Sequence, residues 1–148
     1  MDKRIFEAEI KDRMEVVKRI YEKIKKRRES FKHSVEGVES MALQLHNLYG
    51  AYEEVMKLVA EYFENQIEPP MYHKNLLRRM KLEIEGVRPA LLSQETFSLL
   101  DELRRFYHFL RHAYGVELRA EKVEEMVEIA IKVEPLFLKD LERFISLL

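Results

Sequence analysis

Apolar residues recur at intervals of three and four along most of the chain, which is the spacing that places them on one face of an α-helix. The pattern predicts five helices, over residues 2–28, 31–65, 72–85, 94–114 and 119–148. No segment alternates apolar and polar residues as a half-buried strand does, and the sequence contains no Asn-Gly or Asp-Gly hairpin turn. We therefore expect an all-α protein, an antiparallel bundle of about five helices that forms a single domain over residues 1–148.

Proline, serine and glycine residues mark where these helices begin and end. Pro69 and Pro70 cannot continue the second helix, because proline lacks the backbone N–H that a helix interior needs. Ser93 fits the N-cap of the fourth helix. Gly86 and Gly115 fit the left-handed position that ends a helix, after the third and the fourth helix respectively.

Three more of these residues lie inside predicted helices. A glycine in a helix interior costs about 1 kcal/mol relative to alanine, so we expect Gly37 and Gly50 to lie at close helix crossings. Pro135 should kink the last helix or divide it in two.

The composition agrees with long helices and narrows the chemistry. Of the 148 residues 36% are charged, and glycine and proline occur only four times each. The absence of cysteine excludes disulfides, thiol catalysis and cysteine-based zinc sites. The net charge is −1, so any contact with RNA has to come from a local basic patch. We find no secretory leader and no apolar run of the roughly 20 residues that a membrane span needs, and we expect a cytoplasmic protein.

Arginine and histidine are concentrated on the fourth predicted helix, where residues 104–112 contain three arginines and two histidines. Asp101, Arg105, His108 and His112 are spaced four, three and four residues apart, so they share one face of the helix. A separate apolar stripe on the same helix is expected in the core and consists of Leu99, Leu103, Phe106, Leu110 and Ala113.

This face has the groups that metal-free RNA cleavage requires. The reaction needs a base for the 2′-OH proton, an acid for the leaving oxygen and a cation for the charge on phosphorus. Histidine titrates near neutral pH and can fill either proton role, and arginine is a permanent phosphate ligand. Arg104, Arg105 and Arg111 are therefore candidate RNA-binding residues. The same residue types are also typical of a solvated helix end whose cations stabilise the last carbonyl groups.

The polar residues outside the fourth helix are expected to have structural roles or to lie on the surface. We expect Gln44, His46 and Asn47 to form a buried hydrogen-bonded network that joins helices. His73 is expected to cap the third helix or to lie on the surface, and His33 to lie on the surface.

The two histidines of the fourth predicted helix do not complete a zinc-binding motif. His108 and His112 have the spacing of zinc ligands, but a His-Glu-x-x-His motif would have glutamate where Phe109 stands. We expect neither a metal nor a cofactor. The basic segment 23–28 is interpreted as a solvated helix end.

The arginine–histidine segment resembles the Arg-x(4–6)-His motif of HEPN domains, and in particular of HepT-like proteins, where it often reads Arg-x4-His-x-Tyr. Residues 112–114, His-Ala-Tyr, match the His-x-Tyr end of that motif. Further segments are similar to landmarks of one HepT-like branch, namely 40–49, 72–77 and 87–89. The arginine of that branch usually stands five residues before the histidine, where this chain has Tyr107, and Arg105 fits the longer spacing of the motif.

The resemblance implies a helical bundle that dimerises around a shared cleft and acts as a metal-independent ribonuclease toxin. His112 would be the main proton-transfer residue, Arg105 would bind the scissile phosphate, and His108 and Arg111 would assist. The family also implies a minimal nucleotidyltransferase as antitoxin, which would attach AMP to Tyr114.

Two alternatives remain open. In one, the chain is a non-catalytic helical module that binds RNA or the nucleotidyltransferase through the same face, and Tyr107 favours this reading. In the other, the chain is a structural scaffold without a site, which requires that the face with Arg105 and His112 be buried.

Overall fold

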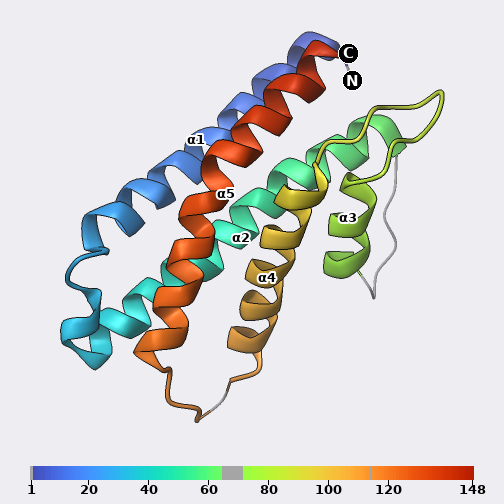
Figure 1. The fold of residues 1–148 in the computed structure, drawn as a ribbon. Coiled ribbons are helices and arrows are strands. Elements are labelled where there is room, and N and C mark those ends of the chain that lie inside the picture. Colours follow the sequence, from blue (N-terminus) through green and yellow to red (C-terminus); the bar gives the residue numbers. More distant parts are fainter. Residues whose placement is uncertain (1, 65–71, 114) are drawn as a thin grey trace.

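The structure is a computed structural model that describes residues 2–64, 72–113 and 115–148. The described chain forms five α-helices and one 3₁₀ turn: α1 (Lys3–Arg27), η1 (Phe31–His33), α2 (Val35–Glu64), α3 (Tyr72–Met80), α4 (Gln94–Arg111) and α5 (Ala120–Ser146) (Figure 1). These residues include no strand, and the β-type pairing seen is an isolated bridge between Ile84 and Arg88. The all-α class predicted from the apolar spacing is confirmed.

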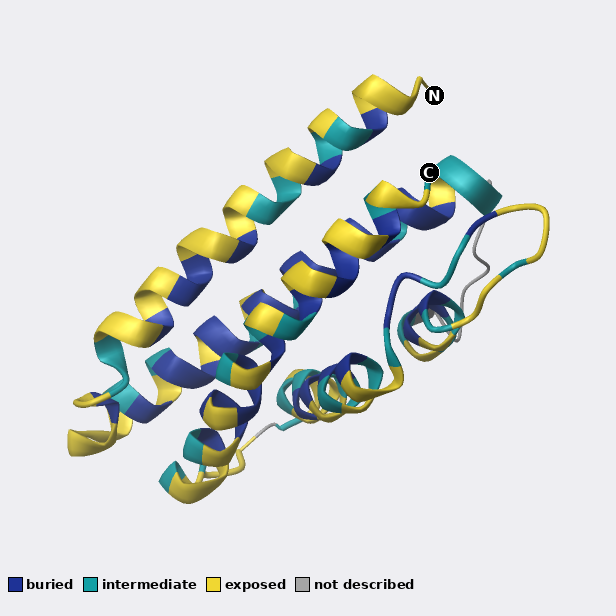
Figure 2. Ribbon diagram, turned by 45° about the horizontal axis from the view of Figure 1, so that its top comes forward, coloured by how far each residue is buried: buried dark blue, intermediate teal, exposed yellow. Residues whose placement is uncertain are grey.

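Helix α2 lies at the centre of the bundle and contacts α1, α3, α4 and α5. α1 runs antiparallel to α2, and α4 runs antiparallel to α5 (Figure 1). Buried residues follow the inner side of the helices and exposed residues the outer side (Figure 2). This is the outcome that the three-and-four spacing requires, because each buried large apolar side chain contributes about 1.5–3 kcal/mol. None of the helices in the described ranges has the length and apolarity that a membrane crossing demands.

Tyr21 joins three helices in the core. Its hydroxyl donates to the carbonyl of Ala130 on α5 at 2.7 Å and lies 2.7 Å from the hydroxyl of Tyr52 on α2. Three ion pairs also connect the end of α1 and η1 to α5, Lys25–Glu134, Arg28–Glu128 and Lys32–Glu124. Part of the basic segment at the end of α1 is therefore paired with glutamates of α5, although exposed pairs of this kind contribute little to stability.

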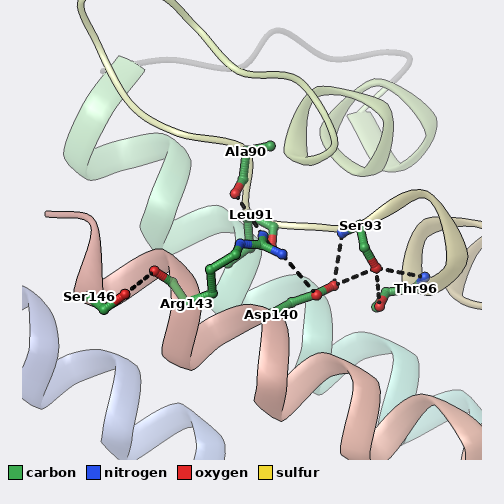
Figure 3. A network of polar contacts seen from close by, with 7 residues as sticks. All are labelled: Ala90, Leu91, Ser93, Thr96, Asp140, Arg143 and Ser146. Atoms are coloured by element: carbon green, nitrogen blue, oxygen red, sulfur yellow. Dashed lines mark hydrogen bonds and ion pairs between the residues drawn. The ribbon is translucent and has the colours of Figure 1, made fainter.

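The N-terminus of α4 is fixed by α5 (Figure 3). Ser93 is the N-cap, as predicted, and its Oγ accepts a hydrogen bond from the N–H of Thr96 at 3.3 Å. Asp140 of α5 is buried and accepts from the N–H and the hydroxyl of Ser93 at 2.8 and 3.0 Å. Arg143 donates to Asp140 and to the carbonyls of Ala90 and Leu91. This network sets the position from which α4 extends.

Helix α3 is shorter than predicted and ends at Met80 instead of continuing to Glu85. The buried guanidinium of Arg88 donates to the carbonyls of Arg79 and Leu82, at 2.9 Å each. The bond to Arg79 satisfies a carbonyl group in the last turn of α3, and the bond to Leu82 holds the connector that follows the helix. Gly86 has the predicted positive φ of 76°, but it serves the turn between Ile84 and Arg88 and is not the cap of α3.

Helices α2 and α4 also differ from the predicted ranges. α2 begins at Val35, because residues 31–33 form the separate turn η1. α4 ends at Arg111 and not at 114, and His112 is its C-cap with φ −121° and ψ 11°. Gly115 has a φ of 70° in the connection beyond it.

The three special residues inside helices behave differently from one another. Gly37 lies at a close approach, since an added Cβ would stand 2.3 Å from the carbonyl oxygen of Phe31, which belongs to η1 and not to a crossing helix. Among the described residues, no atom lies within 4 Å of a Cβ at Gly50, so the prediction of a crossing there was wrong. Helix α5 continues through Pro135 and is not divided.

Candidate functional site

The predicted arginine–histidine face is open to solvent. Arg105, His108 and His112 are exposed, and the side chain of Arg105 is 71% accessible. The rings of His108 and His112 have centroids 4.6 Å apart with 60° between their planes. Arg105 Nη2 lies 2.9 Å from Asp101 Oδ2. Two imidazoles and a guanidinium thus follow one another along the outer side of α4, and the helices of the described chain do not bury this face.

The two flanking arginines differ in their surroundings. Arg104 donates from Nε to Asp101 Oδ1 at 2.8 Å, and its side chain is only 16% accessible. Arg111 is exposed and donates from Nη1 to the hydroxyl of Tyr107 at 3.2 Å. Of the three arginines predicted to bind RNA, Arg105 and Arg111 are the more open, while Arg104 is largely covered and shares the carboxylate of Asp101 with Arg105.

Tyr107 faces the interior, where three helices meet. Its ring stacks on His46 of α2, with centroids 4.4 Å apart and 13° between the planes. The centroids of Tyr49 on α2 and His73 on α3 lie 5.2 and 5.4 Å away. The position five residues before His112, where the motif resemblance predicts arginine, is therefore occupied by an aromatic ring that packs against α2 and α3.

The predicted buried network of Gln44, His46 and Asn47 is not formed. Gln44 is buried, but its Oε1 has no hydrogen-bond partner among the described residues. Asn47 is exposed, and its Oδ1 lies 3.3 Å from His46 Nδ1 on the surface. The prediction was wrong because neighbouring residues of a helix point to different sides, so the three polar side chains do not converge.

A carboxylate–histidine pair that sequence reasoning missed lies behind Tyr107. Glu53 of α2 has a side chain only 3% accessible, and its Oε2 lies 2.5 Å from Nδ1 of His73. Burial raises the pKa of Glu53 above its ordinary value of 4.5, and the contact with His73 partly opposes this. His73 lies in the first turn of α3 with its side chain 36% accessible, so it is partly on the surface as predicted, but its pairing with Glu53 was not predicted. The spacing of His46, Tyr49 and Glu53, three and four residues apart, was the available signal.

Tyr49 carries an unusual buried hydroxyl. The residue is fully buried, and its hydroxyl has no hydrogen-bond partner within the part of the chain that the structure describes. Burial raises the pKa of Tyr49 far above that of a free tyrosine, and the nearby Glu53 adds to the effect. The phenol is therefore neutral and serves as packing beneath Tyr107.

Two hollows border α4. The larger has a volume of about 1130 Å³ and lies where the start of α2, the end of α4 and the start of α5 meet, with His46 at its edge. The smaller, of about 360 Å³, lies between α4 and α5 and is lined by Glu102, Arg105, Phe106, Phe109, Lys122 and Met126. We call this smaller hollow the α4–α5 slot.

Two predictions concern the chemistry next to this face. Tyr114, the predicted modification site, lies outside the described residues. Within the described ranges, no cluster of three or more His, Asp or Glu side chains has the arrangement of a metal site.

The segments singled out in the sequence come together in space around α4. His46 and Tyr49 from the first segment and His73 from the second surround Tyr107 of the fourth. Arg88 of the third has a structural role, because it holds the connector to α3 and pairs with Glu64 of α2 at 3.2 Å.

Comparison with known proteins identifies a family for most of the chain. A family model described as HepT-like protein matches residues 40–148, from the first turns of α2 to the end of the chain. The match thus reaches through α5, beyond the segments noted in the sequence. No curated protein and no solved structure matches the chain significantly. Since the family model covers well over half of the sequence, the chain belongs to the HepT-like family.

Proposed function

We propose that this protein is a metal-independent endoribonuclease, the toxin of a toxin–antitoxin pair that works in the cytoplasm. The observation that carries the proposal is the exposed face of α4, where two imidazoles with centroids 4.6 Å apart follow an exposed arginine. Membership of the HepT-like family favours the same function. A solvated helix end needs no such combination of two titrating groups and a phosphate ligand on one face.

The proposed reaction is transfer of the phosphate within the RNA chain. A base removes the 2′-OH proton, the 2′ oxygen attacks the adjacent phosphorus, and the bond from phosphorus to the 5′ oxygen breaks. An acid returns a proton to that leaving oxygen, so the products are a 2′,3′-cyclic phosphate and a 5′-hydroxyl. His112 is the main proton-transfer residue and His108 assists it. Arg105 binds the scissile phosphate, where a fixed cation stabilises the charge that develops.

The remaining cations would hold the rest of the RNA. Arg111 is exposed at the end of α4, and its guanidinium is oriented by the Tyr107 hydroxyl at 3.2 Å. Arg104 is tied to Asp101 and would make at most a peripheral phosphate contact. Two copies of the chain would place two such faces around one cleft, which would bind RNA on both sides.

Regulation by a minimal nucleotidyltransferase is part of the proposal. Its target would be Tyr114, two residues after His112. Attaching AMP there would add a bulky anion that pairs with Arg105 or Arg111 and blocks the path of the RNA.

The test is RNA digestion in the presence of EDTA by the wild type and by His112→Ala. General acid–base catalysis contributes about 10²- to 10⁴-fold, and we expect a loss of that size. His33→Ala is the matched control, because His33 is an exposed histidine that belongs to η1 and not to α4. Cleavage by His112→Ala at the wild-type rate would contradict the assignment.

One observation favours a second function, a non-catalytic module that binds RNA or a nucleotidyltransferase. The position where relatives usually have the motif arginine is Tyr107, which packs on His46 and offers no cation to the open face. In that case the wild type cleaves no RNA, but it still binds RNA or its partner protein, and Arg105→Ala weakens the binding.

A further inference from the structure

The α4–α5 slot combines an apolar wall with cations at its mouth. Phe106 and Met126 are buried, and Phe109 beside them is 44% exposed. Arg105 and Lys122 also line the slot, with side chains 71% and 52% accessible. The slot has a volume of about 360 Å³, which is the size of a site for a small planar group.

Phe109 is an exposed aromatic residue at the edge of the slot. Its ring lies 26° from the plane of Phe106, with the centroids 6.3 Å apart, so the two rings present roughly parallel faces along α4. Exposed apolar residues are common when they are scattered singly. Phe109, by contrast, stands in an arginine–histidine segment and lines a hollow that it shares with Arg105.

Arg105 connects the slot to the proposed reaction centre. The same side chain lines the slot and shares the open face of α4 with His108 and His112. A phosphate on Arg105 would therefore have the slot directly beside it, within reach of the base attached to the neighbouring ribose. Aromatic side chains that stack on bases next to cations that hold the backbone are the usual means of binding single-stranded RNA.

We propose that the α4–α5 slot binds a nucleobase of single-stranded RNA, stacked on Phe109, next to the phosphate held by Arg105. Glu102 at the slot accepts a hydrogen bond from an exocyclic amino group, which favours cytosine over uracil. Lys122 contacts the next phosphate of the chain. This inference rests on the proposed function for the role of Arg105, and it adds the substrate class and a specificity-determining residue, Phe109.

The test measures binding separately from cleavage. Two non-cleavable ligands are titrated into the full chain by calorimetry: a 2′-O-methyl oligocytidine of five nucleotides, and an abasic backbone of the same length. We expect the wild type to bind the oligocytidine about fivefold to a hundredfold more tightly than the abasic backbone. Phe109→Ala should remove this difference while leaving the affinity for the abasic backbone unchanged, and Phe109→Tyr should keep the difference.

The control is Leu138→Ala, because Leu138 on α5 is an exposed apolar residue with the same 44% exposure. It should change neither affinity. Equal weakening of both ligands by Phe109→Ala, or no change in either, overturns the proposal. So does a change from dimer to monomer in Phe109→Ala with base discrimination intact, because a second copy of the chain would then cover the ring. A wild type that binds neither ligand also overturns it.

The outcome for the slot can be separated from the outcome for the reaction. Base-dependent binding by a wild type that cleaves no RNA supports the slot and contradicts the ribonuclease. Cleavage that depends on His112, together with no effect of Phe109→Ala on base discrimination, supports the ribonuclease and contradicts the slot.

Discussion

The ring of Tyr107 on α4 stacks on the imidazole of His46 on α2, with centroids 4.4 Å apart and planes within 13°. The stack directs the Tyr107 hydroxyl toward Arg111, which donates to it at 3.2 Å. The position five residues before His112 is thus a packed ring that orients the guanidinium of a neighbouring arginine. Arg105 and Arg111 are the exposed arginines near this ring on α4, and they are the phosphate ligands that we propose.

Tyr107→Phe tests this orienting role, because it keeps the stack on His46 and removes the hydroxyl that Arg111 donates to. Hydrogen bonds of charged donors contribute about 1.5–3 kcal/mol, and less where solvent competes. We expect kcat/KM for RNA to fall by about two- to tenfold, while the Tm stays within about 2 °C because the packing is retained. Unchanged RNA cleavage would show that Arg111 does not depend on Tyr107. Tyr62→Phe, in a half-buried ring on the same helix as His46, is the control.

Glu53 makes a pH-dependent contribution to stability. Burial raises the pKa of this carboxyl above its ordinary value of 4.5, against the opposing effects of His73 and Lys57. The folded protein therefore holds the proton more tightly than the unfolded chain does. The stability from this group is fully present below pH 4.5 and is lost as the pH rises through the raised pKa of the folded state.

Glu53→Gln should remove this dependence, since glutamine cannot ionise but can still hydrogen-bond to His73. We expect the free energy of unfolding of the variant, relative to the wild type, to increase as the pH rises above 4.5 and then to level off. Urea unfolding between pH 4 and pH 8 measures the difference. Glu61→Gln, at an exposed position on the same helix, should show no such trend. A difference that falls with rising pH would mean that the ion pair with His73 outweighs the burial of Glu53.

The existence of each helix could be predicted from the sequence, because each one buries a face of apolar residues with a regular spacing. It also placed Arg105, His108 and His112 on one face, since residues three and four apart on a helix are neighbours wherever the helix packs. The ends of helices were less predictable. α3 ends at Met80, where Arg88, eight residues later, donates to the carbonyl of Arg79 in the last turn, and no local sequence pattern predicts that contact.

The cluster around Tyr107 could not be predicted in the same way. It joins side chains from three helices, so its composition depends on how α2, α3 and α4 pack, which the spacing within one helix does not determine. Glu53 illustrates the difficulty, because a glutamate in an apolar stripe is usually a boundary residue, and its partner His73 lies twenty residues away. Gln44 is buried as predicted, but the predicted network with His46 and Asn47 is absent among the described residues, because helix geometry directs the three side chains to different sides.

Loss of the hydroxyl should affect the free energy of unfolding differently at two buried tyrosines. Tyr49→Phe removes a buried hydroxyl that has no hydrogen-bond partner among the described residues, so we expect the free energy of unfolding to stay the same or to rise by up to about 1 kcal/mol. Tyr21→Phe removes bonds to Ala130 and Tyr52, each 2.7 Å long, and should lose about 1–3 kcal/mol. Urea unfolding at pH 7 compares the two. A comparable loss in Tyr49→Phe would reveal a bound water on that hydroxyl.

Asp140 should be the most sensitive single position for the placement of α4. Its carboxylate accepts from the N–H and hydroxyl of Ser93 at 2.8 and 3.0 Å and also from Arg143, so Asp140→Ala leaves several donors without their acceptor. We expect a loss of about 1–3 kcal/mol in the free energy of unfolding. We also expect faster hydrogen exchange in the first turn of α4, because the N-cap is then held only by its own helix. Glu142→Ala, on the exposed side of α5, is the matched control and should stay within about 0.5 kcal/mol of the wild type. If Asp140→Ala matches that control, the network in Figure 3 does not position α4, and the register of Arg105 and His112 depends on the apolar contacts of the helix alone.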